Sequence, residues 1–266
     1  MPNPEKKIYP FDLIHDQMIF SLTSIKNGSD TLTKAQPYSI HGEPQIYTGL
    51  TDLTTGLERY LQTALLFIHY KLGKPLNQKK LKKHSKSLIS LYNAVLDLMQ
   101  KEDNFIDVIK MNKNHALYDF FNFLSDFNAS HKEVNLDVIF GIEKIDASKS
   151  YLQKILVVCD CYFPFVDLNP DEKSLYKSLK KKNGNSKFID SDGKKISKSD
   201  LKISQFKFEK FMYPMVEEFL SLIVSINIFL YQIGKTNFFG TEEHDYASFI
   251  NGQMQKSPAL TFLKFY

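Results

Sequence analysis

The 266-residue sequence contains no tryptophan, only 11 glycines and only two cysteines, Cys159 and Cys161. A disulfide between residues two apart is geometrically poor, and no second cysteine cluster exists to complete a metal site. The cysteines lie in the apolar run ILVVCDCYF, so we expect both to be buried, reduced thiols. Glycine-rich phosphate loops, a GxSxG nucleophile elbow and an HExxH zinc motif are all missing from the sequence.

Arginine is almost absent, because Arg59 is the only one among 34 basic residues. Arginine binds phosphate with two parallel hydrogen bonds, whereas lysine offers a point charge. Any contact with phosphate must therefore use Arg59, lysines or backbone amides. The net charge of +4 is mild, but two tracts concentrate it. These tracts supply the candidate nucleic-acid-binding residues Lys79, Lys80, Lys82, Lys83, Lys180, Lys181 and Lys182. The alternative for each tract is a solvated helix face.

The sequence also lacks a long hydrophobic run. The first ten residues, MPNPEKKIYP, have no apolar core of a signal peptide. The most apolar stretch, Phe219–Tyr231, is shorter than the roughly 20 residues that a bilayer requires. We therefore expect a buried helix there, no membrane partner and a cytoplasmic location.

Helical periodicity of apolar residues dominates the sequence and predicts an all-α fold in a single domain over 1–266. A helix from Phe11 is predicted to stop at Asn27-Gly28, before a polar connection over Ser29–Thr48. A polar excursion over 183–203 includes a small hairpin around Asp192-Gly193. The other predicted helices span about 50–72, 84–100, 116–127, 148–162, 170–182 and 214–233, the last starting at Pro214. Over 50–72, one face is predicted to be apolar and includes Leu50, Leu53, Leu57, Tyr60 and Leu61. Pro170 suits the first turn of the helix that it begins.

Motifs for metal and cofactor chemistry fail on order or spacing. Asp190-x-Asp192-Gly193 places glycine two positions early for a calcium-binding EF-hand. Neither His15-Asp16 nor His244-Asp245 has the further residues of an HD-type phosphohydrolase in the required order. We therefore expect no metal and no cofactor.

Two consecutive segments resemble the HEPN superfamily of small helical bundles. The first is Thr55-Gly-Leu-Glu-Arg-Tyr-Leu-Gln-Thr-Ala-Leu-Leu, which leads to a stop at Gly73 and Pro75. After a basic linker, the second is His84-Ser-Lys-Ser-Leu-Ile-Ser-Leu-Tyr92. The resemblance implies an up-and-down bundle with its HEPN-like core over about 11–130, extended by the C-terminal helices. It also implies that the two matching helices are antiparallel neighbours.

Many HEPN proteins are metal-independent ribonucleases in toxin–antitoxin or phage-defence systems, with an R-x4–6-H motif on one helix. In this sequence Arg59 is followed by no histidine until His69, and the nearest approximation is Lys110-x4-His115. If catalysis occurs, the resemblance implies an arginine or lysine that stabilises phosphate charge and a histidine that moves the proton. The candidate catalytic residues are therefore Arg59, His84, Lys110 and His115.

These observations lead to three functional hypotheses. The leading one is a HEPN-like module that binds nucleic acid or another protein, in bacterial defence or a stress response. The second is a metal-independent endoribonuclease with a diverged active site. Because the first hypothesis is a binding module and the second is an enzyme, the sequence leaves open whether the protein is an enzyme. The third is a structural adaptor that binds an acidic protein. RNA, a protein partner such as an antitoxin, and a second copy of the chain are the partners considered.

Overall fold

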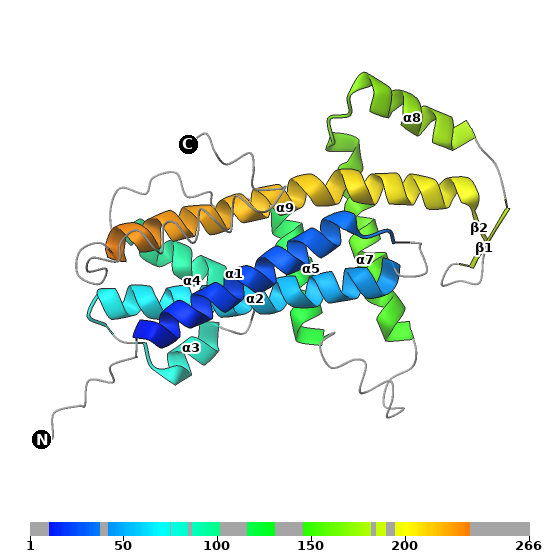
Figure 1. The fold of residues 1–266 in the computed structure, drawn as a ribbon. Helices are drawn as coiled ribbons and strands as arrows, with labels where there is room; N and C mark the ends of the chain where they lie inside the picture. The colour runs from blue at the N-terminus through cyan, green and yellow to red at the C-terminus, as the bar shows by residue number, and fades with distance from the viewer. Residues whose placement is uncertain are drawn as a thin grey trace, which may run out of the picture.

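The protein is described here by a computed structural model, which defines residues 11–37, 42–74, 76–84, 87–101, 116–130, 146–181, 185–189 and 195–234. Helices dominate these residues, which confirms the predicted all-α bundle (Figure 1). The helices are α1 (Phe11–Lys34), α2 (Gly42–Lys71), α3 (Gln78–His84), α4 (Leu88–Lys101), α5 (Ala116–Ser130), α7 (Asp146–Tyr162), α8 (Pro170–Lys181) and α9 (Lys198–Gly234). A short 3-10 helix, η1 (Phe163–Phe165), follows α7.

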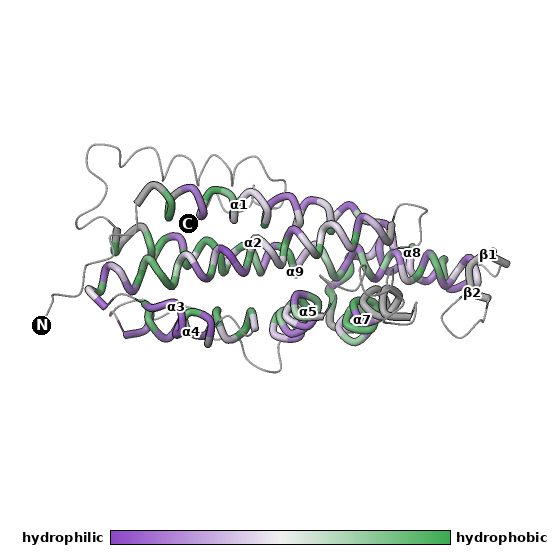
Figure 2. The backbone as a smooth tube through the Cα atoms, turned by 90° about the horizontal axis from the view of Figure 1, so that it is seen from below, coloured by the Kyte–Doolittle hydropathy of each residue, from purple (hydrophilic) through white to green (hydrophobic). Residues whose placement is uncertain are grey.

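The helices form layers around the long helix α2. Figure 2 shows α1 on one side of α2 and α9, with α3, α4, α5 and α7 on the other side. In that view α5 and α7 are seen nearly end-on, so they cross the long helices rather than run along them. The core therefore lies between the long helices and this crossing layer.

Helices α1 and α2 are antiparallel and touch through glycines. Gly28 lies against Gly49 and Leu53, whereas Gly56 lies against Ser21 and Ile25. A Cβ atom added at Gly28 would lie 2.4 Å from the Leu53 nitrogen and 2.6 Å from the Gly49 carbonyl oxygen. Glycine thus allows the two backbones to approach more closely than any side chain would permit.

This contact explains why the predicted end of the first helix is wrong. Asn27-Gly28 resembles a helix stop, but α1 continues to Lys34 because Gly28 is needed for packing against α2. Leu32 continues the same buried face beyond the glycine. The predicted polar connection over Ser29–Thr48 is correspondingly too long, since α2 already begins at Gly42.

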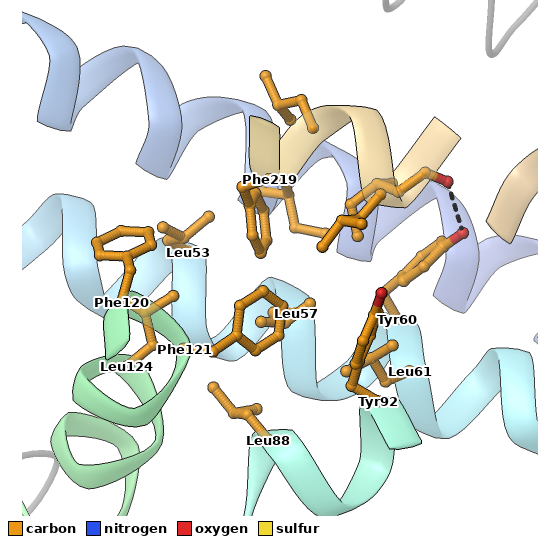
Figure 3. Close-up of a cluster of buried hydrophobic side chains, with 14 of the residues drawn as sticks. Leu53, Leu57, Tyr60, Leu61, Leu88, Tyr92, Phe120, Phe121, Leu124 and Phe219 are labelled. Atoms are coloured by element: carbon orange, nitrogen blue, oxygen red, sulfur yellow. Dashed lines mark hydrogen bonds between the residues drawn. The ribbon is translucent and has the colours of Figure 1, made fainter. Parts of the chain in front are cut away.

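The core is apolar and rich in aromatic rings. The predicted apolar stripe of α2 is buried, with Leu50, Leu53, Leu57, Tyr60 and Leu61 all 0% exposed. Its neighbours come from α4, α5 and α9 (Figure 3). The Phe121 ring lies 5.3 Å from the Tyr92 ring and 5.5 Å from the Phe219 ring, measured between centroids. This cluster joins four helices that are distant in sequence.

Helix α4 lies beside α2, as the sequence predicted. Its direction differs from the prediction, because Figure 3 shows Leu88 near Leu57 and Tyr92 near Leu61. The two helices therefore advance in the same direction where they meet. The reason is that Gln78–His84, expected to be a basic linker, forms the helix α3 between them and returns the chain.

Helix α9 is much longer than predicted, because it begins at Lys198 and contains Pro214 within it. Proline removes one backbone hydrogen bond and costs roughly 3 kcal/mol in a helix interior. Burial of Phe208, Phe211 and Met212 before it offsets that cost, since each large apolar side chain contributes about 1.5–3 kcal/mol. The exposed Pro214 ring faces away from this core. The predicted end at Gly234 is confirmed.

The length of α9 also changes the comparison with a membrane span. Among the described residues, Lys198–Leu230 is the one segment long and apolar enough to cross a bilayer by length and composition. In its most apolar window, 56% is buried against the rest of the protein. That burial is what a core helix shows.

The chain after α7 forms a small second core on α9. Phe163, Leu168 and Phe206 form its buried centre, against which Tyr176 of α8 packs. The predicted hairpin is confirmed as β1 (Asn185–Ile189) paired antiparallel with β2 (Lys195–Ser197), although its Asp192-Gly193 turn lies outside the described residues.

Helix α7 confirms the helical interpretation of the segment that contains the two cysteines. Cys159 is buried, and burial raises its pKa, so this thiol is protonated and unreactive. Cys161 is exposed, which contradicts the expectation that both thiols are buried. Two positions on a helix are separated by about 200°, so residues 159 and 161 necessarily face different sides.

Candidate nucleic-acid interface

The turn between α2 and α3 brings basic side chains together at one end of the bundle. Helix α2 ends in a Schellman turn, in which the Lys74 N–H donates to the His69 carbonyl at 3.0 Å and the Gly73 N–H donates to the Tyr70 carbonyl at 3.1 Å. Gly73 adopts a φ of 65°, which glycine adopts without strain, and the helix stop predicted at this residue is confirmed. This turn fixes the position of Lys74 relative to the last turn of α2.

Helix α3 displays the first lysine tract. Asn77 caps it by accepting a hydrogen bond from the Lys80 N–H at 2.8 Å. Lys79, Lys80 and Lys82 are exposed, and Lys83 belongs to the same helix. His84 is the last residue of α3, whereas the sequence placed it at the start of the next helix. Ser87 takes that place, since its Oγ accepts a hydrogen bond from the Ser90 N–H at 3.1 Å.

His69 lies at the centre of this basic region. Its Nδ1 atom lies 3.0 Å from the Lys74 carbonyl oxygen, so Nδ1 carries the proton and donates. The pKa of His69 is lowered below its ordinary value, first because burial disfavours the cation and then because His84, Lys80 and Lys74 add positive charge. The hydrogen bond to Lys74 acts in the opposite direction. His69 and His84, with Lys74, Lys79, Lys80 and Lys82, are called the α3 patch below.

Sequence reasoning missed His69 as a site residue. The signal was present, because His69 lies in the last turn of a predicted helix, just before the glycine stop and a lysine tract. The fold is needed to bring it close to His84, since 15 residues and a reversal of direction separate them in sequence.

Two of the four candidate catalytic residues, Arg59 and His84, lie among the described residues, and the structure does not bring these two together. Arg59 is exposed on α2, and His69 is about 15 Å further along that helix at 1.5 Å per residue. His84 interacts with His69 instead. Lys110 and His115 lie outside the described residues. Arg59 is thus three helical turns from the histidine that His84 approaches.

The second lysine tract lies on α8, at a distance from the first. A capping box begins this helix: the Asn169 N–H donates to Glu172 Oε2 and the Glu172 N–H donates to Asn169 Oδ1, both at 2.9 Å. Lys173, Lys177, Lys180 and Lys181 are exposed on it, while Lys182 lies outside the described residues. The Lys180 ammonium lies 4.6 Å from the Tyr176 ring centroid. The four described lysines are called the α8 patch below.

One ion pair and one ring contact fix the base of α8. Lys210 of α9 is paired with Glu172 of α8, and the Phe163 and Tyr176 rings are 5.0 Å apart between centroids. A second ion pair joins α9 to α7, where Lys207 lies 2.7 Å from Asp160. Lys207 and Lys210 thus pair internally, whereas the four described lysines of α8 are exposed.

The described part of the chain contains no group of three or more histidine, cysteine, aspartate or glutamate side chains able to hold a metal ion. No family model, curated protein or solved structure matches the sequence. Membership of the HEPN superfamily therefore stays a prediction from the residues quoted above.

Proposed function

We propose that this protein binds RNA through the α3 patch, as a binding module of HEPN-like type. The observation that carries the proposal is the gathering of exposed lysines at one end of the bundle: Lys79, Lys80 and Lys82 lie on α3, and Lys74 lies in the turn, where its carbonyl oxygen is 3.0 Å from His69 Nδ1. Groups of like charge repel one another, and a bound phosphate relieves that repulsion.

The exposure of the lysines supports the same function. Lys79, Lys80 and Lys82 carry their charge at the surface on a single capped helix. Lysines of this kind contact the phosphate backbone without reading the bases, so binding should depend on salt more than on sequence.

The test compares Lys79→Gln/Lys80→Gln with Lys34→Gln/Lys154→Gln, which removes the same charge from exposed positions outside both patches. Affinity for a fluorescent 25-nucleotide uridine RNA is measured by anisotropy at low salt. We expect the first variant to bind about fivefold to tenfold more weakly, because two exposed ion pairs contribute on the order of 1 kcal/mol. The control should bind like the wild type.

Equal affinities of both variants would refute RNA binding at the α3 patch. A polyglutamate peptide serves as the probe for the adaptor hypothesis. Binding of that peptide without binding of RNA would favour an acidic protein partner instead.

A further inference from the structure

We propose that the α3 patch and the α8 patch bind one RNA strand at the same time, so that the protein selects RNA long enough to span the bundle. This inference rests on the proposed function and adds a requirement for substrate length. Its basis is the separation of the two patches on a rigid framework.

The separation follows from the alignment of α2 with α9. The Tyr60 hydroxyl of α2 donates to Asn227 Oδ1 of α9 at 2.8 Å, and lies 3.3 Å from the Ile223 carbonyl oxygen. These bonds place Tyr60 level with the stretch from Ile223 to Asn227. Figure 1 shows that α2 and α9 run in the same direction, as their colours advance together along the bundle.

Helix α8 is attached near the other end of α9. Lys210 pairs with Glu172, and Phe206 packs against Tyr176. From Lys210 to Asn227 the chain rises about 26 Å along α9, and from Tyr60 to His69 it rises about 14 Å along α2. Because both rises point the same way, the attachment of α8 and the α3 patch are about 40 Å apart along the bundle.

The region between the patches is a packed core rather than a linker. Tyr60, Phe121 and Phe219 are each 1% exposed or less, so α2, α5 and α9 hold the distance fixed. A stacked nucleic-acid strand advances about 3.4 Å per nucleotide, so about 12 nucleotides cover the roughly 40 Å along the axis. A strand that contacts both patches must be longer than this, because Figure 1 shows α3 and α8 on opposite sides of the pair formed by α2 and α9. Shorter RNA reaches one patch, whereas longer RNA reaches both.

Two sites on one rigid body gain affinity only if a single ligand spans them. The second contact is then intramolecular, and the gain reaches roughly 10²–10⁴ when the geometry fits. In each patch the charge at the surface comes from a few exposed lysines, and exposed charge pairs contribute little individually. Joint binding therefore makes a weak charge contact selective for length.

The experiment measures the affinities of the full-length protein for 5- and 25-nucleotide uridine RNA by fluorescence anisotropy. A longer strand binds more tightly for two reasons: it can bind one patch at more positions along its length (the statistical gain), and it can contact both patches at once (the bridging gain). The experiment must separate these two gains. Lys177→Gln/Lys181→Gln removes two of the four exposed charges of the α8 patch, so it lowers the gain from bridging and leaves the statistical gain unchanged. Lys34→Gln/Lys154→Gln is the matched control, and circular dichroism confirms that each variant is folded.

We expect the ratio of the affinity for the 25-nucleotide RNA to the affinity for the 5-nucleotide RNA to be about fivefold to tenfold higher in the wild type and in the control than in the α8 variant. An equal ratio in the α8 variant and the wild type would overturn joint binding while leaving the α3 patch as an RNA site. No detectable binding of either RNA would overturn both the inference and the proposed function.

Discussion

Substituting Gly28 by alanine tests the glycine contact between α1 and α2. In an open helix this change stabilises by about 1 kcal/mol, because alanine has the higher helix propensity. Here the new Cβ would lie 2.4 Å from the Leu53 nitrogen, 2.6 Å from the Gly49 carbonyl oxygen and 2.9 Å from the Leu53 Cα. All three atoms belong to the backbone, so no side chain can rotate to make room.

The predicted magnitude is the difference between these two effects. Overpacking costs typically about 1–3 kcal/mol, and contact with rigid backbone belongs at the upper end. Subtracting the gain of about 1 kcal/mol in helix propensity leaves a net loss, so Gly28→Ala should lower the free energy of unfolding by about 2 kcal/mol. With roughly 2.1 cal/mol/K of unfolding entropy per residue, this corresponds to a fall in Tm of about 4 °C.

The assay is thermal and urea unfolding followed by circular dichroism. Asn27→Ala is the control, since the neighbouring Asn27 is exposed and its replacement should stabilise slightly. A Gly28→Ala variant that is as stable as the wild type, or more stable, would refute the close approach of the two helices.

Three further changes test other parts of the structure. Tyr60→Phe should lower the free energy of unfolding in urea by about 1–2 kcal/mol, because the buried Asn227 Oδ1 loses its hydrogen-bond donor. An unchanged urea midpoint would contradict the hydrogen bond between Tyr60 and Asn227. Arg59→Gln should alter RNA affinity no more than Lys34→Gln does, since Arg59 is about 15 Å along α2 from His69; a loss of tenfold would restore Arg59 to the site. The pKa of His69 is lower in the folded chain than in the unfolded chain, so at pH values just below the ordinary histidine pKa the unfolded chain binds more protons than the folded chain. The contribution of His69 to the free energy of unfolding therefore falls as the pH falls through this range. RNA affinity should rise over the same range as phosphate favours the imidazolium, and His69→Asn should weaken both trends in pH-dependent unfolding and anisotropy.

Local patterns predicted much of the helical framework. The spacing of Leu50, Leu53, Leu57 and Leu61 defined the buried face of α2, and all four are fully buried. Gly73 was identified as a helix stop because its conformational freedom acts locally. Pro170 likewise marked the start of α8.

Tertiary contacts decided the positions where the predictions were wrong. Gly28 and Pro214 have the local character of a helix end and a helix start, yet both lie inside helices whose burial outweighs that preference. In the site, exposed lysines could be read directly from the charge pattern. The electrostatic effect of His84 on His69 could not, because it depends on α3 returning the chain toward α2.

The most direct measurement of RNA binding at the α3 patch is the salt dependence of affinity. A 25-nucleotide uridine RNA is titrated between about 50 and 200 mM salt, the range over which phosphate contacts change affinity most visibly. Two lost phosphate contacts should reduce the slope of log affinity against log salt by about 1.4 in Lys79→Gln/Lys80→Gln. The same slope in this variant and the wild type would contradict the account.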